Sequence, residues 1–468
     1  MASPAAAARP AAAPARVPPR VLAAILMGTV LNPINSSMIA VALVRVGRDF
    51  DVGVVSLSWL ISSFYLVAAV GQSVLGRLAD QFGPRRLQCL GFAVVVIAGA
   101  LGPLAPSFGW LIAARLLLAV GTSAGYPAGL ALLRKASGGQ RPAPSSIAAI
   151  TIANSSSAAL GPVIGGALVA LANWPAIFYV NVAFGLIALP LALRWLPRDP
   201  QHAAGVRIAT VRRIVDLPGI AAFTALLASL LALLLSLARE PLWWLVPVAL
   251  LAGAALVWSD RRRADPFLDV RMLAENRALL GVCVQYLLVN VVAFGIFFAL
   301  PLWLEAARGF GSGTAGLLVA PLAGVAVIAA PIAARLVARR GERAALLAGA
   351  CAMVAGTLLL ATWSTGTPLW AILPATVVLG IPIGFNNLGL QSALYGASDP
   401  HRTGAAAGLF QTCRFIGAVL STSLLGVVFA DGVDSAGLHE LALILAGVSA
   451  VVLAASLRRG DPRVTRRG

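Results

Sequence analysis

Carboxylates that could take up and release a proton are the first candidates for chemistry in this sequence. The chain has 17 Asp and Glu among 468 residues, and all of them fall in predicted loops or near the ends of apolar runs. The carboxylate of Glu305 lies at the end of one such run, and that of Asp80 lies between two others. Because the pKa of a carboxylate follows its solvation, either residue is a candidate for proton coupling in a process that changes its surroundings.

Catalytic and metal-binding patterns are missing from the sequence. It has no G-x-x-x-x-G-K-[ST] phosphate loop, and its few His, Cys, Asp and Glu residues have no metal-ligand spacing. The four cysteines lie singly in apolar runs, with no C-x-x-C pair. The sequence therefore predicts no enzyme activity, no catalytic residue, no metal and no cofactor.

Polar residues inside apolar runs are candidates for ligand binding. The run that begins at residue 21 is interrupted around Pro33, and such interrupted helices point to binding sites in transport proteins. Asn35 in this run could bind a ligand or could satisfy backbone groups near the proline. Arg115 lies in another run and is a candidate functional residue, because a charge is costly in a membrane, unless it reaches the outer interface. A further arginine, Arg414, lies in a later run.

Composition shows which elements position these residues. The chain is 59% hydrophobic and 11% charged, with a mean hydropathy of +0.90, whereas a soluble protein carries about 25% charged residues. Apolar runs long enough to cross a bilayer recur along the whole sequence. We therefore predict an all-α polytopic membrane protein. The predicted helices cover 21–44, 54–76, 87–105, 109–133, 145–171, a span from Trp174 to Arg194, 217–237, 242–258, 277–303, 313–338, 343–363, 369–394, 403–429 and 438–457.

Basic residues indicate the orientation of these helices. With a cytoplasmic N-terminus, most of the 35 Lys and Arg residues fall in cytoplasmic segments, as the positive-inside rule expects. The net charge of +18 therefore reports orientation and not a nucleic-acid partner. The exceptions in predicted outer loops are Arg45, Arg48, Arg239 and Arg308.

A short charged connection, GRLADQFGPRR from Gly76 to Arg86, separates two apolar runs, and a similar segment occurs later in the chain. The segment RLVARRGER, beginning at Arg335, repeats its spacing, with Gly341 in the place of Gly83. The repeat predicts two related halves. The predicted organisation is a disordered tail over 1–20, a first half over 21–196, loops with two extra helices over 197–276, a second half over 277–457 and a basic cytoplasmic tail over 458–468.

Three segments resemble motifs of the major facilitator superfamily. The first is the Gly76 to Arg86 connection, which is similar to G-x-L-A-D-R-x-G-R-R but departs from it at Gln81 and Pro84. The second is SAALGPVIGG, which resembles the antiporter motif G-x-x-x-G-P-x-x-G-G with Ser157 in place of its first glycine. The third, around Asn35, resembles the first-helix motif of the fourteen-helix drug:proton antiporters, with Asn35 in place of an acid.

This resemblance implies two six-helix halves plus two extra central helices, rocking about a cavity between them. In the family that cavity is lined by the first and fourth helices of each half. The substrate-binding residues that it implies are Asn35, Ser37, Arg115, Tyr126, Gln285, Tyr286, Asn290, Asn386, Asn387 and Gln391. The gating and packing residues that it implies are Gly76, Asp80, Gly83, Arg85, Arg86, Gly161, Pro162, Gly165 and Gly166.

The sequence thus predicts a monomeric, multi-pass transporter of the bacterial cytoplasmic membrane, with both termini in the cytoplasm. Its partners are a small-molecule substrate, the lipid bilayer and, for proton-coupled efflux of a drug-like or natural-product-like compound, protons. One alternative is an uncoupled exporter or facilitator of a neutral or anionic solute, since no acid lies in mid-span. A second alternative is a membrane sensor that transports nothing.

Overall fold

The computed structural model describes residues 17–137, 144–199, 216–237, 240–263, 267–398 and 403–459. Every regular element in these residues is a helix. The elements of the first half are α1 (Pro19–Met38), η1 (Ile39–Val41), α2 (Leu43–Asp49), α3 (Val54–Phe82), α4 (Pro84–Leu101), α5 (Phe108–Ser123), α6 (Gly125–Ala136), α7 (Pro144–Ala172) and α8 (Ala176–Trp195). The central and later elements are α10 (Leu217–Ser236), α11 (Leu245–Arg262), α12 (Val270–Glu275), α13 (Arg277–Ala306), α14 (Ser312–Arg340), α15 (Glu342–Leu360), α16 (Leu369–Ala397), α17 (Thr403–Val428) and α18 (Ser435–Arg458).

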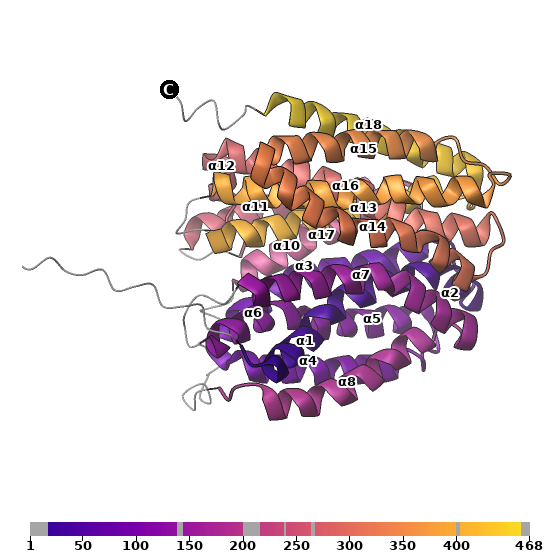
Figure 1. Cartoon of the computed structure of the whole chain (residues 1–468). Helices are drawn as coiled ribbons and strands as arrows, with labels where there is room; N and C mark the ends of the chain where they lie inside the picture. The colour runs from indigo at the N-terminus through magenta and orange to yellow at the C-terminus, as the bar shows by residue number, and fades with distance from the viewer. Residues whose placement is uncertain are drawn as a thin grey trace, which may run out of the picture.

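The long helices form two bundles that lie one above the other in Figure 1, the earlier helices in purple and the later ones in orange and yellow. The bundles meet where α7 packs on α14 and α3 packs on α17. The central pair α10 and α11 packs together, and α10 also contacts α3 and α17 at the edge of this seam. The seam between the bundles is therefore formed by α3, α7, α14 and α17.

Length and composition make the protein a multi-span membrane protein. Thirteen helical spans in the described part of the chain are long and apolar enough to cross a bilayer, with α5 and α6 counted together as the span Phe108–Ala136. The helix α11 is not among them, because its 18 residues include Asp260, Arg261 and Arg262. A total of fourteen spans therefore stays a prediction.

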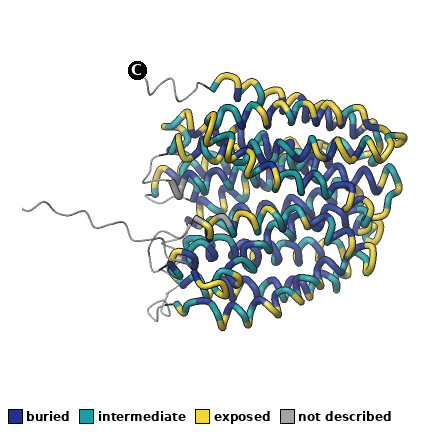
Figure 2. Tube along the Cα trace, viewed as in Figure 1, coloured by how far each residue is buried: buried dark blue, intermediate teal, exposed yellow. Residues whose placement is uncertain are grey.

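The surface distribution of apolar side chains fits a bilayer. Large apolar side chains lie exposed on the outward faces of the helices, as for Leu171, which is 86% exposed, and Trp370, which is 77% exposed. Figure 2 shows buried residues turned toward the interior of the bundles and exposed ones toward the outside. In a soluble protein so much exposed apolar surface would drive association, whereas lipid tails cover it at no cost.

The internal repeat is visible in how two helices end. Gly83 follows α3 with φ +95°, and Gly341 follows α14 with φ +84°. This left-handed region is open to glycine and costly for residues with a Cβ. Both glycines let the chain turn at once into the next helix, so the repeated spacing in the sequence corresponds to a repeated turn.

The helix that the sequence predicted to be interrupted at Pro33 runs on through this proline, and another long helix also contains prolines. Pro33 lies inside α1, and Pro374 and Pro382 lie inside α16. A proline removes one backbone donor, and in a packed bundle neighbouring groups compensate for that loss. The first helix instead changes to a 3₁₀ turn after Met38. The span predicted over 109–133 is divided at Ala124, where Gly125 packs directly on the Gly28 carbonyl of α1.

The start of α1 in the first bundle and the end of α18 in the second bundle lie at the same end of the protein, which we call the terminal end. Because the long helices alternate in direction, α7, α13 and α17 begin at the terminal end, and α3, α14 and α16 end there. This assignment places every functional feature below at one end or the other.

Candidate functional site

A cavity of about 270 Å³ lies between the two bundles. From α7 it is lined by residues near the start of the helix, such as Asn154, and from α16 by residues near its end, such as Gln391. The wall away from the terminal end is lined by Pro33, Ser36 and Tyr65. The cavity therefore occupies the middle of the protein and the half toward the terminal end.

At the opposite end the two bundles are in close contact. The hydroxyl groups of Ser62 on α3 and Thr422 on α17 form a hydrogen bond between the bundles. On the other side of the seam, a Cβ added at Gly166 of α7 would lie 2.6 Å from the backbone oxygen of Ser312 on α14. The bundles are thus closed on each other at the opposite end, with the cavity on the terminal side of the closure.

Several of the substrate-binding residues predicted from the sequence line this cavity together. They come from α1, α13 and α16 and reach it from both bundles, as a shared binding site requires. These residues are Ser37, Tyr286, Asn290, Asn387 and Gln391. The Oδ1 atoms of Asn154 and Asn387 have no hydrogen-bond partner in the described part of the chain, so both can receive a hydrogen bond from a ligand.

Asn35 and Arg115 do not line the cavity but belong to a polar cluster inside the first bundle. The amides of Asn35 and Asn181 exchange two hydrogen bonds, of 2.7 and 2.8 Å. The Arg115 guanidinium donates to the Asn35 backbone oxygen at 3.0 Å and lies 4.5 Å from the centre of the Phe64 ring. With 2% exposure, Arg115 is buried and does not reach the outer interface. The cluster joins α1, α5 and α8.

Three further residues predicted to bind substrate are also absent from the cavity lining. The Gln285 amide donates to the Ser456 hydroxyl at 2.7 Å and so joins α13 to α18. Asn386 is fully buried against Gly349 of α15. Tyr126, on α6, is partly buried against the apolar core.

The sequence interpretation did not count Arg414 of α17 among the substrate-binding residues. Arg414 lines the cavity together with aromatic residues, which are Tyr65, Phe294 and Phe297. The signal that could have found Arg414 was present, because a charge in an apolar run marks a functional site. The aromatic residues carried no such signal, since a ring in an apolar helix has the same pattern whether it faces the cavity, the core or lipid.

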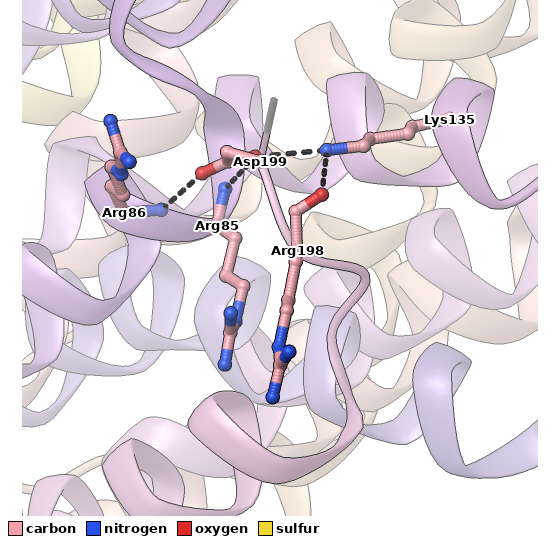
Figure 3. A network of polar contacts seen from close by, with 5 residues as sticks. All are labelled: Arg85, Arg86, Lys135, Arg198 and Asp199. Atoms are coloured by element: carbon pink, nitrogen blue, oxygen red, sulfur yellow. Dashed lines mark hydrogen bonds and ion pairs between the residues drawn. The ribbon is translucent and has the colours of Figure 1, made fainter. Parts of the chain in front are cut away.

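The connection predicted to act as a gate is held at the terminal end by Asp199, which follows α8. Its carboxylate accepts the backbone N–H of Arg86 at 2.9 Å and that of Arg85 at 3.4 Å, at the start of α4. It also forms a 3.0 Å ion pair with Lys135 at the end of α6 (Figure 3). A carboxylate at a helix N-terminus satisfies free N–H groups and the helix dipole. The side chain of Asp80 lies outside the described part of the chain.

The glycines of the segment resembling the antiporter motif lie where α7 meets other helices. Gly161 and Gly165 face Ser37 and Met38 of α1, and Gly166 faces α14. In the other direction, Gly316 of α14 packs on the Pro162 backbone oxygen. Small residues at these positions let the helix backbones approach closely.

Glu305 lies near the end of α13, at the closed end of the seam and not in the cavity. Its carboxylate is 5% exposed, and its Oε2 atom accepts a 2.8 Å hydrogen bond from the Ser312 hydroxyl. The Oε1 atom has no partner in the described part of the chain. Arg45 and Arg48 of the first bundle interact with this carboxylate electrostatically. A carboxylate of the second bundle thus lies in the field of two cations of the first.

The sequence is similar to those of known proteins. Residues 25–422 match the family model of the Major Facilitator Superfamily. The chain is 36% identical to an uncharacterized MFS-type transporter, YwoD, of Bacillus subtilis, over 92% of this chain and 95% of the relative. It is 31% identical to the puromycin resistance protein pur8 of Streptomyces alboniger, over 86% of this chain and 80% of the relative. It is 26% identical to the methylenomycin A resistance protein of Streptomyces coelicolor, over 91% of this chain and 90% of the relative.

The fold is also similar to a solved structure. A mutant form of the nucleoside transporter NupG superposes with a TM-score of 0.67 at 13% identity, covering 93% of this chain and 99% of that one. A likeness at this identity concerns the fold alone. The family match covers most of the sequence and agrees with the two bundles and the cavity between them. The chain therefore belongs to the major facilitator superfamily and is a transport protein, not an enzyme.

Proposed function

We propose that the protein exports a drug-like or natural-product-like small molecule from a bacterial cytoplasm in exchange for protons, by alternating access. The observation that carries this proposal is the cavity between the bundles, closed at one end by contacts between the bundles. Two relatives of this chain are resistance proteins for puromycin and methylenomycin A, which favours export of a compound of that kind.

The distribution of basic residues supports a cytoplasmic location for the terminal end. The cavity then lies on the cytoplasmic side of the closed seam, which is the arrangement in which an exporter receives its substrate. To release the substrate outside, the Ser62–Thr422 and α7–α14 contacts must separate while the terminal ends of the bundles approach each other. Gly166 and Pro162 of α7 lie on the surface that would move, whereas Gly161 and Gly165 pack on α1 inside the first bundle.

Glu305 is the residue that we propose for proton coupling. It is buried, it lies at the seam, and the Arg45 and Arg48 cations belong to the other bundle. Burial is the largest influence on the proton affinity of this carboxylate, and separation of the bundles would admit water to it, so the affinity would differ between the two conformations. That difference is what coupling requires. Asp80 remains a second candidate from the sequence.

The test measures drug accumulation across a compound panel in cells that lack their own pumps, with and without a proton uncoupler. Expression of the protein should lower the accumulation of at least one compound, and the uncoupler should restore it. Glu305→Gln should remove the dependence of flux on the proton gradient in membrane vesicles. Glu440→Gln, at an exposed site on α18, is the matched control and should behave as wild type.

One observation favours an alternative, uncoupled export. No carboxylate lines the cavity among the described residues, and Asn35 stands where the resembling antiporters have an acid. Under this alternative the uncoupler has no effect, and Glu305→Gln transports as wild type does. Unchanged proton coupling in Glu305→Gln would exclude Glu305 while leaving export in place.

A further inference from the structure

The charge of the cavity wall is positive. Among the described residues that line the cavity, Arg414 is the only charged one. The others are apolar, aromatic, or neutral and polar. One cation thus lies in the wall of a cavity whose described lining contains no acid.

Among the described residues, Arg414 has no counter-ion. Its side chain is partly buried, and in the described part of the chain it makes no hydrogen bond and no ion pair. Its described close contact is with the Phe294 ring, whose centre lies 5.8 Å from the guanidinium carbon. A guanidinium carries five N–H donors arranged to bind a carboxylate in bidentate fashion. In a partly dry cavity these donors favour an anionic partner.

The remaining wall suits an aromatic or apolar body. Tyr65 and Phe294 pack edge to face at 5.1 Å across the seam. The Tyr286 ring is stacked on Phe410 at 3.5 Å, which fixes the plane that it presents to the cavity. The free Oδ1 atoms of Asn154 and Asn387 can receive hydrogen bonds from a ligand. Rigid rings beside one cation form a site for a flat molecule with one acidic group.

We infer that the cavity binds an aromatic organic anion, with its acidic group on Arg414 and its ring system between Tyr286 and Phe294. This inference rests on the proposed function in one respect, that the cavity is the transport site. The inference also predicts that cations bind most weakly. A positively charged amphiphile would meet the Arg414 guanidinium and no acid among the described lining residues, so it should bind more weakly than a neutral or anionic ligand.

The experiment compares three ligands of one shape and different charge on the purified full chain. Radiolabelled 2-naphthoate is bound at equilibrium in detergent, and 2-naphthamide and 2-naphthylmethylamine compete with it. We expect the anion to bind at least tenfold more tightly than the neutral amide, and the amine to bind most weakly, because a charge-assisted hydrogen bond is about twice as strong as a neutral one. Arg414→Gln should remove the preference for the anion, and Arg414→Lys should keep part of it.

Arg262→Gln is the matched control, since Arg262 is exposed and stacks on Trp258 of α11, outside the cavity. It should bind all three ligands as wild type does. The inference is overturned by absent naphthoate binding, by equal binding of the three ligands, by a preference for the amine, or by a full anion preference in Arg414→Gln. Binding is read without flux or a proton gradient, so a failure of proton-coupled export leaves this result standing, and the reverse also holds.

Discussion

The Lys135 ammonium and the Asp199 carboxylate form a 3.0 Å ion pair at the terminal end of the first bundle (Figure 3). Lys135 Nζ also donates to the Arg198 backbone oxygen at 2.7 Å. Because Asp199 accepts the first N–H groups of α4 as well, one carboxylate connects the ends of α4, α6 and α8. The side chain of Asp199 is 1% exposed, whereas that of Lys135 is 29% exposed.

Asp199→Asn should therefore lower the stability of the protein. The change removes the ion pair and replaces charged acceptors with a neutral one at the start of α4, a loss of about 1–2 kcal/mol. Thermal unfolding in detergent measures it as a lower midpoint. Asp431→Asn, at an exposed turn after α17, is the control and should leave the midpoint unchanged. If Asp199→Asn had the same unfolding midpoint as wild type, the charge of the Asp199 carboxylate would contribute nothing to the stability of the protein.

Gly83→Ala should be destabilising for a related reason. The positive φ of Gly83 strains any residue with a Cβ, and the added methyl group would collide with the Asp199 carboxylate. The expected loss is about 1–3 kcal/mol, again read as a lower unfolding midpoint. Gly341→Ala carries the same φ strain but meets nothing within 4 Å, so the difference between the two variants isolates the collision. Equal losses in both would mean that the Asp199 loop simply moves aside.

A cross-link at the closed end of the seam should stop transport. Ser62→Cys and Thr422→Cys place two thiols where two hydroxyl groups are in contact across α3 and α17. The background lacks the native cysteines Cys89, Cys283, Cys351 and Cys413. Oxidation should abolish flux and reduction should restore it, because alternating access requires these helices to separate. Each single variant serves as the control, and full flux in the cross-linked protein would exclude opening at this end.

Stability in acid should depend on Asp216, which precedes α10. Burial acts to raise the pKa of this carboxyl, but hydrogen bonds and a nearby cation outweigh it, so that the folded pKa lies below the ordinary 3.8. The partners are the Gly219 and Phe267 N–H groups, the Ser259 hydroxyl and the Arg263 guanidinium. A depressed pKa stabilises the fold above the unfolded value, and this contribution is lost as the pH falls through the folded value.

The measurement compares wild type with Asp216→Asn in unfolding scans at several pH values. The variant should have a lower unfolding midpoint than wild type at neutral pH. The difference between the two midpoints should become smaller as the pH falls below about 4. A gap that stays constant with pH would mean that the carboxylate charge plays no part and that only its hydrogen-bonding shape matters.

The sequence by itself determined the multi-span membrane character, the superfamily and the equivalent turns at Gly83 and Gly341, because apolar runs of bilayer length and turn glycines are local properties of the chain. The family resemblance also pointed to Tyr286 and Asn387, which line the cavity in the structure. The tertiary structure decided which arginine faces the cavity, placing Arg414 there and Arg115 inside the first bundle.

The physical reason is that both the bundle interior and the lipid are apolar. A helix in a bilayer therefore has apolar residues on every face, and the pattern that would show which side is buried in a soluble protein is absent. Partners far apart in the sequence, such as Lys135 and Asp199 or Ser62 and Thr422, meet only when the helices have packed. The sequence supplies the polar groups, and packing decides which of them face the cavity.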